Sequence, residues 1–138
     1  MASLLLNLGD MHGTEKDKIH LFEHFIDSYC PSISSTIARL TGLSDKKELE
    51  TISVNVLVDL WKNSDDLFNE IPPTAFIYKI LLQHVFTYLK RQHDEVHIRQ
   101  LQDTLLIDPV HYAHFLKPEK RSFRISRLLL KMRKMLKS

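Results

Sequence analysis

Residues 49–63 read LETISVNVLVDLWKN, and residues 74–92 read TAFIYKILLQHVFTYLKRQ. Both stretches repeat apolar residues at gaps of three and four, and side chains at these gaps share one face of an α-helix. Neither helix can bury its apolar face alone, so the two are expected to pack together across a short loop that contains Pro72 and Pro73. Trp61 ends the apolar face of the first helix, and its indole is expected to be buried between the pair.

The chain before this pair carries the same helical spacing. A helix is expected over residues 15–41, and Thr14 begins an approximate capping box in front of it. Pro31 lies inside this helix and is expected to kink or split it, because proline lacks an amide donor and clashes with the preceding turn. Gly42 is expected to end the helix in a left-handed conformation.

The boundaries of the central pair follow from their flanking residues. Ser44 is expected to cap a helix over residues 45–63, since its hydroxyl can accept a hydrogen bond from the first turn. Residues 64–73 are expected to form a loop that is anchored on the core by Phe68. Thr74 is expected to cap the second helix, which would end near residue 93.

The pattern after the pair is less regular. Helices are expected over residues 97–107 and 119–137, where apolar residues again recur at helical spacing. The prediction is an all-α bundle of about five or six helices. It is divided into an N-terminal segment (1–13), a helical core (14–93) and a C-terminal extension (94–138).

Composition limits the classes of protein to which the chain can belong. A chain of 138 residues is expected to form one domain, or one domain with an appendage. Cys30 is its one cysteine, which excludes a disulfide framework and favours the cytoplasm. No stretch approaches the ~20 apolar residues of a membrane span, and the N-terminus lacks the basic segment of a signal peptide. No phosphate-binding loop, nucleophile elbow or paired-carboxylate motif is present, so no enzyme activity, catalytic residue or cofactor is predicted.

Eight histidines raise the question of a metal site. His20 and His24 are four residues apart, as are His93 and His97, and such pairs can seat zinc. A zinc site needs a third and a fourth ligand, and the sequence offers no motif that supplies them. No metal site is predicted.

Charge is unevenly distributed along the chain. Residues 1–116 hold ten Lys and Arg against sixteen Asp and Glu, whereas residues 117–138 hold nine Lys and Arg against Glu119 alone. This polarity suggests a basic tail that faces a partner. The alternative is that the tail neutralises the acidic body within the fold.

The two quoted helices resemble region two of the extracytoplasmic-function (ECF) sigma factors of bacteria. The resemblance spans residues 22–91 and depends on the hydrophobic spacing, on Trp61 and Tyr78, and on the basic pair Lys90 and Arg91. It implies that the first helix binds the clamp of the RNA polymerase core and that the second opens promoter DNA.

The clamp-binding helix of this family carries an Asp-x-x-Gln-Glu cluster. Aligned through Trp61, these positions hold Thr51, Val54 and Asn55, which depart from the family. Glu50 and Asp59 nearby keep negative charge. An amphipathic helix that only packs into the fold is the alternative. The polymerase-binding residues that the resemblance implies are Glu50, Thr51, Val54, Asn55 and Asp59.

The promoter-opening helix of the family offers Asn, Asp and Arg to a flipped base and its strand. Gln83, Thr87 and Lys90 occupy these positions, and the amide of Gln83 can read a base edge. Phe86 lies off the apolar face, where it could stack on an unpaired base, whereas Tyr88 is expected in the core. The DNA-binding residues predicted on this helix are Lys79, Gln83, Phe86, Thr87, Lys90 and Arg91.

The C-terminal sequence SRLLLKMRKML resembles the closing helix of the second DNA-binding region of the family. Its basic stripe, also predicted to bind DNA, consists of Arg124, Arg127, Lys131 and Lys134. Residues 95–122 lack the pattern of a complete helix-turn-helix, so either the second region is truncated or the likeness is a coincidence between basic amphipathic helices.

The leading hypothesis is therefore a diverged sigma-like transcription-initiation protein of the cytoplasm. Its partners would be core RNA polymerase, promoter DNA and an anti-sigma or other regulator protein. The alternative is a helical interaction module that keeps the scaffold without promoter activity and binds a protein through Val54, Leu57 and Val58. A weaker alternative is self-association through Leu57, Leu129 and Leu130.

Overall fold

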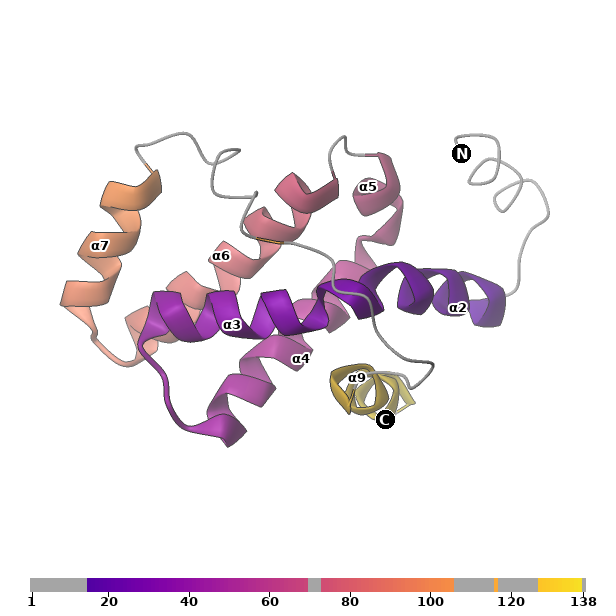
Figure 1. Cartoon of the computed structure of the whole chain (residues 1–138), viewed down its shortest axis with the longest axis horizontal. Helices are drawn as coiled ribbons and strands as arrows, with labels where there is room; N and C mark the ends of the chain where they lie inside the picture. The colour runs from indigo at the N-terminus through magenta and orange to yellow at the C-terminus, as the bar shows by residue number, and fades with distance from the viewer. Residues whose placement is uncertain (1–14, 70–72, 106–115, 117–126, 138) are drawn as a thin grey trace.

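The computed structural model describes residues 15–69, 73–105, 116 and 127–137. Every regular element in these residues is a helix, which confirms the all-α bundle (Figure 1). The predicted cap at Thr14 and the predicted DNA contact Arg124 lie outside the described residues. The elements are α2 (Glu15–Ile26), the 3-10 helix η1 (Asp27–Tyr29), α3 (Cys30–Thr41), α4 (Lys46–Lys62), α5 (Ser64–Asn69), α6 (Pro73–Arg91), α7 (Glu95–Leu105) and α9 (Arg127–Lys137).

The long helix expected before the central pair is split, as Pro31 predicts. α2 passes through the 3-10 turn of η1 into α3, and Pro31 lies in the first turn of α3, where its missing amide would have had no helical partner. Gly42 ends α3 in the left-handed conformation with φ of 71°, and its amide donates to the carbonyl of Ala38 at 2.9 Å. Both boundaries follow from backbone sterics.

Asp45, and not Ser44, caps α4. The Oδ1 atom of Asp45 accepts a hydrogen bond from the backbone amide of Lys47 at 2.9 Å, and the helix begins at Lys46. Asp45 also has the extended backbone that a capping residue needs. A carboxylate at this end is further stabilised by the helix dipole, an advantage that a serine hydroxyl lacks.

The expected loop between the central helices contains the short helix α5. Asp65 and Asp66 lie in its first turn, where negative charge complements the helix dipole. Leu67 is fully buried and anchors α5 to the core, while Phe68 is half-buried and packs edge-on against Phe25, with 5.6 Å between the ring centres. Leu67, and not the predicted Phe68, is therefore the anchor of this segment.

α4 and α6 pack against each other, as their apolar faces predict, and α3 packs on both (Figure 1). α6 begins at Pro73, one residue before the predicted cap Thr74, since proline suits the first position of a helix. The indole of Trp61 is not buried between the central pair as expected: it is half-buried at the rim of the core and meets Phe22 of α2 edge-on, with 5.6 Å between ring centres. The core residues of the central pair include Ile52, Val56, Leu60, Ile77, Leu81, Val85 and Leu89.

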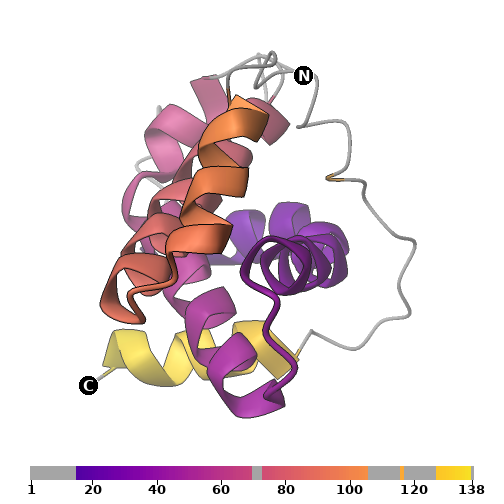
Figure 2. The ribbon, with the colours of Figure 1, turned by 90° about the vertical axis from the view of Figure 1, so that its left-hand side faces the viewer.

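α9 lies across α4 on the side away from α6 and α7, as the yellow helix in Figure 2 shows. Leu129 and Met132 of α9 are completely buried. The basic end of the chain is therefore a structural part of the bundle. Within the described residues, no helix has the length and apolar character needed to cross a membrane.

Candidate functional site

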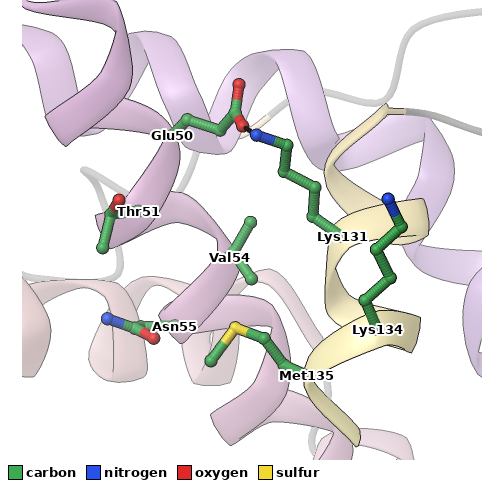
Figure 3. A pocket seen from close by; sticks show the side chains of 7 residues that line it. All are labelled: Glu50, Thr51, Val54, Asn55, Lys131, Lys134 and Met135. Atoms are coloured by element: carbon green, nitrogen blue, oxygen red, sulfur yellow. Dashed lines mark ion pairs between the residues drawn. The ribbon is translucent and has the colours of Figure 1, made fainter. Parts of the chain in front are cut away.

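A groove of about 310 Å³ runs between α4 and α9 (Figure 3). Four of the five predicted polymerase-binding residues line its α4 side, and two residues of the basic C-terminal stripe line the other. The sequence interpretation gave these two sets separate partners, but the structure brings them together. The α4 side of the groove is lined by Glu50, Thr51, Val54 and Asn55, and these four residues are called the α4 face. The α9 side is lined by Lys131, Lys134 and Met135.

Glu50 is engaged by two cations of α9. Its Oε1 atom forms an ion pair with the Nζ atom of Lys131, which Figure 3 shows as a dashed line. Its Oε2 atom lies 3.7 Å from the Nε atom of Arg127. The predicted DNA contacts Arg127 and Lys131 thus neutralise a carboxylate of the same chain.

A second ion pair joins α9 to α2, and the sequence interpretation missed both of its members. Arg133 donates from Nε to Oε2 of Glu23 and from Nη2 to Oε1, each at 2.5 Å. The Glu23 side chain is only 4% exposed, and its hydrogen bonds raise the pKa of Arg133 above the usual value. A sequence signal existed, because Glu23 falls three residues before Ile26 and four after Ile19, on the apolar side of α2.

The rest of the predicted polymerase-binding set is only partly accessible. Val54 lines the groove but is only 3% exposed, so it offers little surface in this arrangement, whereas Thr51 is exposed and Asn55 is half-buried. Asp59 is half-buried, and its Oδ2 atom lies 2.9 Å from Nε2 of His84, which ties α4 to α6. Thr51 and Asn55 are the members of the set that an incoming protein could reach first.

The alternative binding surfaces are also covered. Val54 and Leu57 were expected to bind a regulator, but both are buried, and only Val58 beside them is half-exposed. Leu129, expected to promote self-association, is buried as well, while Leu130 remains 46% exposed. The sequence interpretation left these faces open because it did not pack the C-terminal helix against them.

One face of α6 carries a row of exposed polar residues: Lys79, Gln83, Thr87 and Lys90, here called the α6 face. Their gaps of four, four and three place them on one side of the helix. Arg91 is exposed next to this row. The predicted contacts on α6 are therefore brought together on an accessible surface.

The two aromatic residues near the α6 face differ in their surroundings. Phe86 is half-buried, and the Nζ atom of Lys90 lies 6.0 Å from the centre of its ring. Tyr88 is half-buried rather than a core residue, and its hydroxyl donates to Oε2 of Glu48 at 3.1 Å. Burial, and then this hydrogen bond, raise the pKa of Tyr88 above its ordinary value.

Two histidines of the described helices, His84 and His97, pair with carboxylates. The Nδ1 atom of His97 lies 2.7 Å from Oδ2 of Asp94, and Nε2 of His84 bonds Asp59. No group of three or more His, Cys, Asp or Glu side chains with metal-binding geometry occurs in the described part of the chain. Cys30 is buried, and its thiol donates to the carbonyl of Ile26 at 3.6 Å.

Comparisons with protein-family models, with curated proteins and with solved structures found no match. Function is therefore inferred from the α4 face with α9, from the α6 face, and from the sequence resemblance.

Proposed function

We propose that the protein is a diverged sigma-like transcription-initiation protein of the bacterial cytoplasm, which contacts promoter DNA through α6 and core RNA polymerase through α4. The observation that carries this proposal is the exposed row of the α6 face. Gln83, Thr87 and Lys90 are the residues at the DNA-contacting positions that the resemblance implies, and all three are exposed on one side of the helix.

The chemistry of the α6 face suits an unpaired strand. The Gln83 amide can donate to and accept from a base edge, and Phe86 offers a half-exposed ring on which a base can stack. Lys90 lies beside that ring and would meet the phosphate of a stacked nucleotide. Lys79 and Arg91 would meet phosphates on either side.

Fluorescence anisotropy with a labelled single-stranded promoter oligonucleotide tests this proposal over a series of salt concentrations. Three phosphate contacts, from Lys79, Lys90 and Arg91, predict that log K falls with log[salt] at a slope of about −2. The double variant Lys79→Ala/Lys90→Ala should lower the magnitude of the slope to about 0.7. Arg99→Ala is the control, because Arg99 is an exposed cation on α7 and not a member of the α6 face.

Gln83→Ala is a separate test of base reading. It should weaken binding to the preferred oligonucleotide and leave the salt slope unchanged, since it removes no charge. Binding that is absent, independent of salt, or equally lost in Arg99→Ala would contradict promoter contact through α6.

A second candidate, favoured by the position of α9, is a helical interaction module without promoter activity. α9 lies against the α4 face and pairs with Glu23 and Glu50, which accounts for three of the nine cations of the basic tail without nucleic acid. This candidate predicts no binding to the oligonucleotide and a protein partner instead, such as the expected anti-sigma or other regulator. The same anisotropy series therefore separates the two.

A further inference from the structure

α9 occupies the surface through which polymerase would bind. Within the α4 face, Glu50 supplies the carboxylate that would meet the polymerase clamp. Val54 occupies one of the positions that bind the clamp in the family that the sequence resembles. In the structure, Glu50 is paired with Arg127 and Lys131, and Val54 is buried. A second protein cannot bind Glu50 and Val54 while α9 covers these two residues.

We propose that α9 is an intramolecular competitor of core RNA polymerase, which must leave the α4 face before polymerase binds there. This inference rests on the proposed function. The apparent affinity for polymerase then equals the intrinsic affinity multiplied by the fraction of molecules in which α9 has left. Any factor that loosens α9 would increase polymerase binding without a change in the α4 face itself.

The ion pairs that α9 makes with α4 and α2 differ in strength. Arg127 and Lys131 have side chains that are 79% and 42% exposed, so water and salt weaken their attraction to Glu50. The pair between Arg133 and Glu23 is more strongly held, because the carboxylate is almost completely buried. Among the ion pairs that hold α9, that of Arg133 is therefore the one whose loss would loosen the helix most, against the burial of Leu129 and Met132.

The contacts that α9 makes also indicate which chemical groups a partner protein would need in order to bind in its place. Once α9 leaves, Glu23 and Glu50 lose their cationic partners, and Val54 loses its apolar cover. A replacing surface would need basic groups to meet the two carboxylates around an apolar centre. Thr51 and Asn55 remain reachable at the groove while α9 is bound, so a partner can make first contact there (Figure 3).

Charge reversal in the full chain tests this competition. Arg133→Glu places two carboxylates against each other at Glu23, and Lys131→Glu is a milder variant that repels Glu50 at a more exposed position. Neither alters the α4 face. Arg99→Glu makes the same change in net charge at an exposed position of α7, a helix that the ion pairs of α9 with Glu23 and Glu50 do not involve, and serves as the control.

Two measurements are made on each variant. Hydrogen exchange reports whether the amides of α9 lose protection while those of α4 and α6 keep it, which distinguishes release of α9 from unfolding. Labelled chain titrated with bacterial core RNA polymerase gives the dissociation constant. We expect Arg133→Glu to expose α9 and to tighten polymerase binding by about tenfold or more, with a smaller gain for Lys131→Glu and none for Arg99→Glu.

The outcomes separate this inference from the proposed function. Equal polymerase affinity in wild type and in variants whose α9 has lost protection would refute competition and leave polymerase binding intact. Unchanged protection of α9 in both reversal variants would refute the assigned role of the two ion pairs. Failure of every chain to bind polymerase, including those with α9 released, would refute the polymerase half of the proposed function and the competition with it.

Discussion

The pair between Glu23 and Arg133 should show strong energetic coupling. Removal of one member of a buried ion pair costs roughly 3–5 kcal/mol, because the other charge is left without a partner. Arg133→Met leaves the Glu23 carboxylate in a site where it is 4% exposed. The Arg133 side chain is 33% exposed in the folded protein, so water already screens part of the attraction. We therefore expect a loss of about 2–3 kcal/mol in the free energy of unfolding.

The complementary variants complete a double-mutant cycle. Glu23→Met should cost only about 1 kcal/mol, because the freed guanidinium can turn to water. The double variant Glu23→Met/Arg133→Met replaces both charges by apolar side chains and should be close to wild type. Urea unfolding followed by circular dichroism gives the four free energies, and we expect a coupling of about 3–4 kcal/mol.

The result that would refute this reasoning is additivity. If the double variant loses the sum of the two single losses, the two side chains do not interact in solution, and α9 is not held on α2 by this pair. The slope of the unfolding free energy against urea concentration must also be compared among the variants. Release of α9 before global unfolding would lower this slope.

Three further predictions concern the scaffold. Gly42→Ala should lose about 1–2 kcal/mol in urea unfolding, because φ is 71° and a Cβ atom would lie 2.9 Å from Nε2 of His97; an unchanged midpoint would contradict the left-handed turn. Asp45→Ala should lose about 1 kcal/mol and Ser44→Ala almost nothing, and the reverse order would show that the serine is the cap. The raised pKa of Tyr88 means that its contribution to stability is complete below the ordinary value of 10.0 and is lost as pH rises through the higher folded value. Urea midpoints measured from pH 9 upward should therefore fall less in Tyr88→Phe than in wild type.

The scaffold was predictable where one local rule decides the outcome. The apolar spacing of the central pair predicted their packing, and the backbone restrictions of Pro31 and Gly42 predicted the break in the long first helix and the end of α3. The cap of α4 was not decided locally, because Ser44 and Asp45 are adjacent and both suit a helix N-terminus. α5 was missed because its first residues, Ser and two Asp, are as common in turns as in the first turn of a helix.

The site was predictable only in part, because its contacts join distant parts of the chain. Glu23 and Arg133 are 110 residues apart, and no periodicity within one helix links them. The sequence did show an acidic body and a basic tail, and it left open whether the tail faces a partner or neutralises the body. The structure confirms neutralisation for Arg127, Lys131 and Arg133.

This neutralisation divides the cations of the chain into two groups that salt affects differently. Those of the α6 face are exposed, so salt above about 0.1 M, where the Debye length is ~10 Å, should weaken their attraction to phosphates. Lys131 and Arg127 hold α9 on Glu50 at positions open to water, so the same salt should loosen α9. Intermediate salt should therefore weaken oligonucleotide binding while raising the fraction of molecules with an uncovered α4 face. Since the pair at Glu23 is buried and screened less, this second effect should be larger in Arg133→Met than in wild type.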